Sequence, residues 1–235
     1  SVAQYGGNYL AFVVLGVLGA VVDRYATDPE NPWAIAHGIL ARGPDLRLPD
    51  GSDAVEHLVT RYAEVHEVGG RALFGFPRSA AGRLVEPHSD LLLKSLGEAG
   101  VSPDATFTVA GRAVTLADLY RYTLLKTFLV AKTNHASFQS PNDTPWTVQA
   151  LAQWAPGVEL QWIALDSTPM DLDDLGTFLC AVLTQESAWM FERMQKGEKF
   201  EKQGQNLFNY SCGGAHLVQG AAVAVVPLGI SILRD

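Results

Sequence analysis

Hydrophobic positions along most of the chain recur at the three- and four-residue spacing of an amphipathic helix. One stripe holds Val55, Leu58 and Tyr62, and another holds Leu92, Leu96 and Ala99. Such a spacing puts apolar side chains on one helical face, which can then be buried. We therefore expect about seven helices, which begin near residues 32, 54, 87, 116, 145, 172 and 212.

Local signals fix where these helices begin and end. A polar residue followed three positions later by an acidic one begins three of them: Asp53 with Glu56, Thr115 with Asp118, and Asp171 with Asp174. This pairing satisfies backbone N–H groups of the first turn, and acids are expected there because of the helix dipole. Gly69-Gly70 is expected to end the second helix, and Gly100 the third.

Strand signals are few. Residues 106–109 and 113–114 flank Ala110-Gly111-Arg112, which predicts a β-hairpin, and residues 158–165 form a short strand-like piece. The fold class expected is all-α, mainly helical with one or two short β-hairpins. We expect stacked helix pairs, which an incomplete α/α toroid would arrange in a ring.

Three helices begin with proline followed by an aromatic ring. These starts, Pro32-Trp33, Pro87-His88 and Pro145-Trp146, lie about 55 to 60 residues apart, and a fixed period indicates a repeat. Chance is the competing explanation, because proline is common at the first helical position. Short helices begun in this way resemble the α/α-toroid proteins, which include glycan-active enzymes, prenyltransferases and lanthionine cyclases. The resemblance implies a site at one end of the inner helices, here those that begin near 32, 87, 145 and 212.

Composition and charge narrow the function. The 235 residues are 48% hydrophobic and 18% charged, with a net charge of -8. So much apolar surface argues against disorder, and the negative balance argues against nucleic acid as a partner. We expect two parts, an N-terminal apolar segment and linker over residues 1–30 and a single helical-repeat domain over 31–235. The sequence does not decide whether the protein is cytoplasmic or exported.

The N-terminal run Tyr9–Val22 is apolar. It is shorter than the roughly 20 residues that a membrane span needs. A buried helix is the first interpretation, and docking on a membrane surface or a larger protein partner is the second.

Histidine and cysteine side chains gather at the starts of the proposed inner helices. His37 follows Trp33 by four residues, His88 begins the next such helix, and Cys212 stands four residues before His216. Residues four apart share a helical face, and a thiol in the first turn is favoured as thiolate by the helix dipole. We therefore predict that Cys212 and His216 face the same cavity as His37 or His88. These four residues could bind zinc, and Cys212 could instead be a nucleophile with His216 as its base. A buried thiol beside a core histidine is the structural alternative.

Glu186 is a further candidate for catalysis. It lies on an otherwise apolar stripe beside Trp189, where a carboxyl group could act as a general acid. A carboxylate paired with arginine is the commoner explanation of such a residue.

Two functions remain open. The first is an α/α-toroid-like enzyme or small-ligand-binding domain with a His/Cys site, with zinc as the possible cofactor. The second is a non-catalytic accessory or scaffold subunit that docks through Tyr9–Val22. Substrate and reaction are not specified by any motif in the chain.

Overall fold

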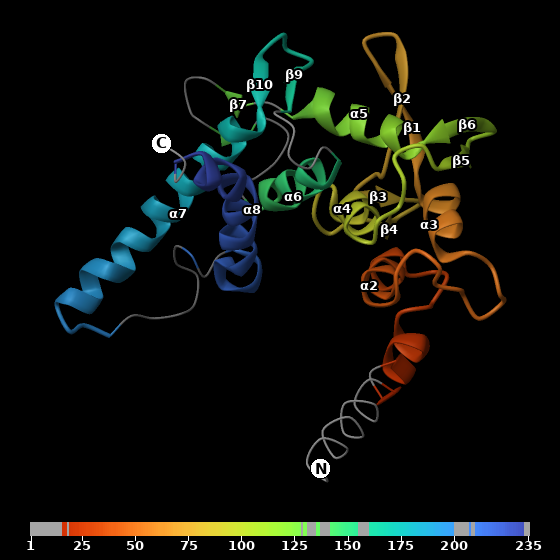
Figure 1. Cartoon of the computed structure of the whole chain (residues 1–235), viewed down its shortest axis with the longest axis horizontal. Coiled ribbons are helices and arrows are strands. Elements are labelled where there is room, and N and C mark those ends of the chain that lie inside the picture. Colours follow the sequence, from red (N-terminus) through yellow and green to blue (C-terminus); the bar gives the residue numbers. More distant parts are fainter. Residues whose placement is uncertain are drawn as a thin grey trace.

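The computed structural model describes residues 16–17, 19–127, 129–130, 135–136, 142–154, 160–199, 207 and 210–232. Helices dominate these ranges, so the mainly helical prediction is confirmed (Figure 1). The principal helices are α2 (Pro32–Arg42), α3 (Ala54–Tyr62), α4 (Leu91–Glu98), α5 (Leu116–Lys126), α6 (Thr144–Trp154), α7 (Leu172–Gln195) and α8 (Ala215–Ile232).

The even-numbered helices pack in a row. Helix α2 packs against α4, α4 against α6, and α6 against α8. The odd-numbered helices lie beside this row, with α3 on α2, α5 on α6, and α7 on both α6 and α8. Successive helices therefore alternate between the row and its flank. Closure of the row into a ring stays a proposal.

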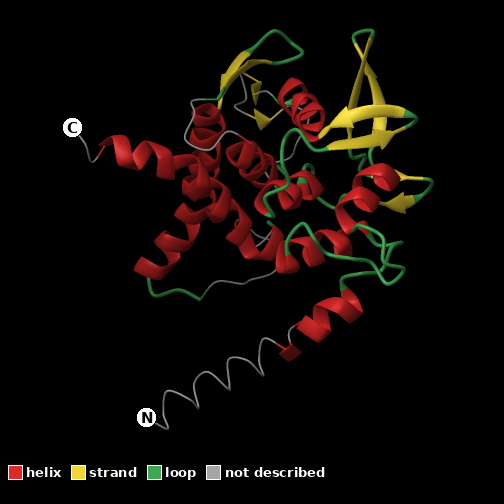
Figure 2. Cartoon of the chain, turned by 45° about the vertical axis from the view of Figure 1, so that its right-hand side comes forward, coloured by secondary structure: helices red, strands yellow, loops and turns green. Residues whose placement is uncertain are grey.

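Short strands lie at the edges of the helical body (Figure 2). Within the described residues they form five two-stranded antiparallel sheets. The pairs are β1 (Glu64–Val68) with β2 (Arg71–Gly75), β3 (Ser79–Ala80) with β4 (Arg83–Leu84), β5 (Thr106–Val109) with β6 (Arg112–Thr115), β7 (Leu129–Val130) with β8 (His135–Ala136), and β9 (Gln161–Ile163) with β10 (Pro169–Asp171). The hairpin at Gly111 is where the sequence places it. The prediction of one or two hairpins is too low.

The second helix ends earlier than predicted. It stops at Tyr62, and the next residues form the β1–β2 hairpin. Gly69 and Gly70 have φ of +56° and +75°, the left-handed pair that a two-residue hairpin turn requires. The two glycines are therefore a hairpin turn, and they do not end a helix.

The third helix begins later than predicted. It starts at Leu91, so His88 lies before the helix and does not belong to its stripe. Asp90 has φ of +63°, which prevents the helix from extending back to Pro87. The Glu86 carboxyl group instead accepts hydrogen bonds from the backbone N–H groups of Asp90 (3.2 Å) and Leu92 (2.9 Å) at this start.

The last helix also begins later than predicted. Cys212 lies in a 3₁₀ turn, Ser211–Gly214, with φ of +53°, and α8 begins only at Ala215. The helix continues to Ile232. Cys212 and His216 therefore belong to adjacent elements, and they do not share one regular helix.

The predicted helix starts are otherwise confirmed. Capping boxes are present at Thr115–Asp118 and Asp171–Asp174. The Asp53 side chain accepts the Glu56 N–H. A cap of this kind stabilises a helix by about 1 kcal/mol. Asp171 and Asp174 thus have a structural role.

One contiguous cluster of buried hydrophobic side chains runs from Ile35 to Ala224. Its most buried members come from the row and its flank, among them Ile35, Ile39, Leu92, Leu96, Leu151 and Leu175. At the N-terminus, residues 16–17 and 19–25 are helical, and Val17 and Val21 are exposed. The rest of the Tyr9–Val22 run lies outside the described residues. No helix among the described residues has the length and apolar character that crossing a membrane requires.

Candidate functional site

The starts of the row helices surround one cleft of about 970 Å³. Side chains reach it from α2, from the segment before α4, from α4 and α6, and from the turn and first residues of α8. His37, His88, Cys212 and His216 all line it. These four residues therefore lie around one cavity, as the sequence predicted.

One wall of the cleft belongs to α2. Trp33 is 48% exposed there, and its ring lies 4.2 Å from that of His37, centroid to centroid. His37 Nδ1 lies 2.7 Å from the Trp33 carbonyl oxygen. A carbonyl can only accept, so Nδ1 donates the hydrogen bond. The asparagine cap at Asn31 and Pro32 at the first position fix where this turn begins.

The opposite wall holds an aromatic stack centred on Trp146 of α6. The His88 ring stacks on it at 5.1 Å and 13°, and the His216 ring contacts it at 4.1 Å and 38°. The ammonium group of Lys94 lies 5.7 Å from the Trp146 ring centre, within cation–π distance. The Trp146 indole is therefore packed against two imidazoles, which come from segments far apart in the sequence.

A buried carboxylate holds His88. Asp143, directly before α6, lies 3.3 Å from His88 Nδ1. The same carboxylate accepts hydrogen bonds from Arg78 and from the Ser89 N–H, both at 3.3 Å. A carboxylate on Nδ1 favours the tautomer protonated there and fixes the orientation of the ring. Asp143 therefore orients His88 within the cleft.

His216 and Cys212 complete the cleft at the start of α8. Burial lowers the pKa of His216, and the nearby His88 and Lys94 act in the same direction, although a hydrogen bond to the Gln219 side chain opposes them. His216 is therefore a neutral imidazole at pH 7. Cys212 is exposed, and neither it nor Cys180 is in a disulfide. The positive φ of Cys212 is a conformation that non-glycine residues adopt rarely and that collects at functional sites.

One of the predicted site residues is not part of this arrangement. Glu186 is half-buried on α7, where Tyr210 donates a hydrogen bond to it at 3.5 Å, and it does not line the cleft. Among the residues that the structure describes, no three His, Cys, Asp or Glu side chains are grouped so as to hold a metal ion. Zinc stays a prediction.

Sequence reasoning missed Lys94 and Asp143. Lys94 lies in a run of leucines and is only 6% exposed, where it pairs with Glu98 at 2.7 Å. A charged residue inside an apolar stripe was the available signal. Asp143 stands just before Thr144-Pro145, so it could be read only as a helix start, because its partners are more than 50 residues away.

A second polar cluster lies where the starts of α4 and α6 meet the end of α5. Asp90 accepts hydrogen bonds from Thr123 (2.7 Å), Lys126 (2.8 Å) and Thr147. Burial opposes ionisation of Asp90, but the Lys126 charge and these hydrogen bonds outweigh it and lower its pKa. Burial disfavours the Lys126 ammonium too, and the Asp90 and Glu86 carboxyls nevertheless raise its pKa. Both groups are charged at pH 7.

Comparison of the chain with protein-family models, with curated proteins and with solved structures gives no match. The site must therefore be interpreted from its own geometry.

Proposed function

We propose that this protein binds a small molecule in the cleft at the starts of α2, α4, α6 and α8 and acts on it as an enzyme of α/α-toroid type. The observation that carries the proposal is the convergence of His37, His88, Cys212 and His216 on that one cleft. Ligand sites are concave, largely apolar and supplied with a few convergent polar groups.

The aromatic walls suggest how a ligand is held. Trp33 presents an exposed indole beside the His37 ring, and the buried Trp146 indole lies behind the rings of His88 and His216. Flat apolar faces of this kind bind rings or sugar-like planes by dispersion and stacking. Asp28, Glu30 and Lys94 add charged groups to the same cleft. We infer a ligand with a planar or apolar body and polar substituents.

The imidazoles suggest proton transfer as the chemistry. His88, held by Asp143, and neutral His216 are the candidate bases, since an imidazole can accept or relay a proton. Cys212 is the candidate nucleophile, since its thiol is exposed in the same cleft. Glu186 has no part in this proposal.

Zinc remains an addition that can be tested separately. Cysteine and histidine are the ligands that zinc prefers. Metal analysis of the purified protein and of Cys212→Ser settles the point. One zinc per chain that the variant loses supports a metal centre. If the purified protein contains no zinc, the proposed metal centre is ruled out, and the acid–base proposal is unaffected.

The proposal is tested with a fragment library screened by ligand-observed NMR. We expect aromatic, polar-substituted fragments to bind. Their affinity falls about tenfold in Trp33→Ala, because an aromatic contact of about 1.5 kcal/mol is lost. Phe191→Ala is the matched control, since Phe191 is an exposed aromatic residue on α7 that does not line the cleft. Fragments that bind both variants equally would refute the site.

One observation favours the second candidate function, that of a non-catalytic accessory subunit. Val17 and Val21, four residues apart on a helical segment, are 59% and 48% exposed. An exposed apolar face of that kind suits docking on a protein partner or a membrane surface. Removal of residues 1–25 tests it. Unchanged solubility and mass in solution would show that the segment docks on nothing.

A further inference from the structure

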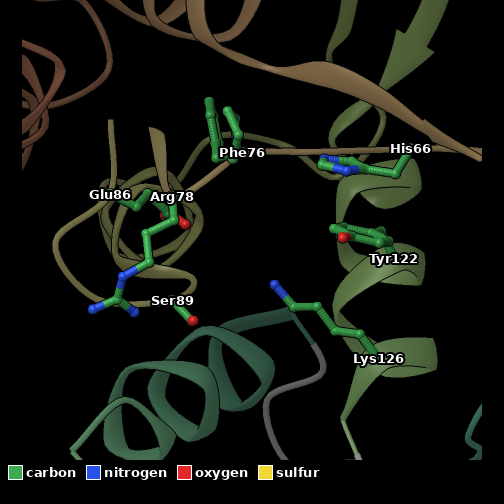
Figure 3. Close-up of a pocket in the computed structure, with 8 residues that line it drawn as sticks. His66, Phe76, Arg78, Glu86, Ser89, Tyr122 and Lys126 are labelled. Atoms are coloured by element: carbon green, nitrogen blue, oxygen red, sulfur yellow. The ribbon is translucent and has the colours of Figure 1, made fainter. Parts of the chain in front are cut away.

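A second cavity lies beside the buried cluster and is separate from the cleft. Its volume is about 310 Å³. For comparison, a dry cavity of about 150 Å³ accommodates benzene. Figure 3 shows the Lys126 amine and the Tyr122 hydroxyl turned toward the middle of this cavity, whereas the Arg78 guanidinium points away from it. Ser89 lines the cavity on the side across from Lys126.

One side of the cavity is aromatic and apolar. The rings of His66 and Tyr122 stack at 4.4 Å and 8°, and Phe76, which is almost fully buried, faces the same space. Gly75 allows this packing, because a side chain there would collide with the Tyr122 ring. This wall is a preformed surface for a flat apolar group.

The polar side of the cavity is rich in hydrogen-bond donors. Lys126 has three N–H groups, of which one is directed to Asp90. Ser89 and Tyr122 contribute hydroxyl groups for which, among the described residues, the structure records no partner. The two cations, Lys126 and Arg78, have counter-charges in Asp90 and Asp143. The remaining ionisable carboxyl on the lining is Glu86.

We propose that this cavity binds a small aromatic carboxylate, with its ring against Phe76 and the His66–Tyr122 stack and its carboxylate toward Lys126, Ser89 and Tyr122. Charge-assisted hydrogen bonds from an ammonium group and two hydroxyls match a carboxylate well. The apolar wall makes an aromatic acid a better ligand than a bare inorganic anion. Glu86 must be protonated for the anion to enter, since a second carboxylate in so small a space would repel it.

Glu86 makes the binding depend on pH. Burial, and next the charge of Asp90, raise the pKa of Glu86 to about 8, against the opposing effects of Lys126 and two backbone N–H groups. The other groups that face it are Arg78, which stays charged, the His66 ring, and Tyr122, whose pKa burial raises. Above pH 8 the cavity therefore gains a negative charge on Glu86.

The test measures benzoate binding to the whole protein by calorimetry, with benzamide and inorganic phosphate as comparison ligands. At pH 7 we expect benzoate to bind more tightly than either. Between pH 7 and pH 9.5 its affinity falls about thirtyfold, since a site that must be protonated loses about tenfold per pH unit above a pKa of about 8.

Three variants make the test specific to this cavity. Glu86→Gln, which cannot ionise, reduces the pH dependence of benzoate binding to less than about threefold. Ser89→Ala weakens binding at pH 7 about tenfold, because a hydrogen bond to a charged group is lost. Ser79→Ala, on exposed β3, leaves it unchanged. If Glu86→Gln fails to fold, the comparison of Ser89→Ala with Ser79→Ala still tests the proposed binding.

Four results would overturn the proposal. They are an absence of benzoate binding at pH 7, equal or tighter binding of benzamide or phosphate, the same pH dependence in Glu86→Gln as in the unaltered protein, and equal binding by Ser89→Ala and Ser79→Ala. Trp33→Ala should bind benzoate normally, and a loss there would place the benzoate in the cleft instead.

Discussion

The Asp90 cluster and the cleft both gather polar side chains at helix starts, but they differ in how those side chains are satisfied. Asp90 is nearly inaccessible to solvent, and Thr123, Lys126 and Thr147 all donate to it. In the cleft, His37 and Cys212 are exposed and His88 and His216 are half-buried. The His37 and His88 rings are each held through Nδ1, by the Trp33 carbonyl and by the Asp143 carboxylate.

This difference distinguishes residues that stabilise the fold from residues that are available for binding. A buried charge must be paired, or its desolvation destabilises the fold, so Asp90 holds α4, α5 and α6 together. His37 and Cys212 are spared this penalty, because solvent reaches them. Their side chains are accessible to a ligand. Substitutions in the two regions should therefore have opposite effects on stability and on binding.

The largest effect is expected for Asp90→Ala. It leaves the Lys126 ammonium buried without its partner, which typically costs about 3–5 kcal/mol of unfolding free energy. Chemical denaturation measures it. Asp104→Ala is the matched control, because Asp104 is exposed, and it should stay within about 0.5 kcal/mol. A loss below about 1 kcal/mol for Asp90→Ala would mean that the cluster does not hold the helices together.

The next effect is the pH dependence that Glu86 imposes on stability. Its pKa rises from 4.5 when unfolded to about 8 when folded. The folded state therefore holds a proton that the unfolded state releases. The stabilisation that this gives is fully present below pH 4.5 and disappears as pH rises through 8. Between pH 6 and pH 8 the loss amounts to about 2 kcal/mol. Denaturation of Glu86→Gln over the same range should lack this loss, and parallel curves for the two proteins would contradict the prediction.

A smaller effect on stability is expected for His88→Gln. The residue is half-buried, and Asp143 keeps Arg78 and the Ser89 N–H as partners. The loss should be about 1 kcal/mol, mainly the Trp146 stacking contact. Fragment binding in the cleft should fall at least tenfold in the same variant. A variant that loses much more stability than this, but binds fragments as tightly as the unaltered protein, would reverse the distinction between the two regions.

The smallest effect on stability is expected for Cys212→Ser. The residue is exposed, so the change should be within about 0.5 kcal/mol. Iodoacetamide should modify Cys212 of the unaltered protein faster than half-buried Cys180, and a cleft-bound fragment should slow that reaction. Mass spectrometry after timed alkylation measures both. Modification of Cys180 first, or no protection by bound fragments, would count against the cleft.

Local sequence signals predicted the helices and most of their starts, because a cap is decided by residues three apart. Thr115–Asp118 and Asp171–Asp174 are examples. The β1–β2 hairpin was missed, since Gly69-Gly70 is compatible with a helix end and with a turn, and only the pairing of strands decides between them.

The site was predicted in part for a related reason. Proline-aromatic starts and the resemblance to toroid proteins indicated which helix ends converge, and His37, His88, Cys212 and His216 do line one cleft. Asp90, Lys126 and Thr147 could not be found in this way. Their contacts join residues 36 and 57 positions apart, and the sequence pattern carries no information on such distant pairs.

The most direct test of the cleft as the functional site is NMR of the histidine rings during fragment titration. The account predicts that a fragment sensitive to Trp33→Ala shifts the ring signals of His37, His88 and His216 together. His57 should not respond, because it contacts the Pro29 carbonyl and does not line the cleft. Shifts confined to His57 or His66, with the three cleft histidines unchanged, would contradict the account.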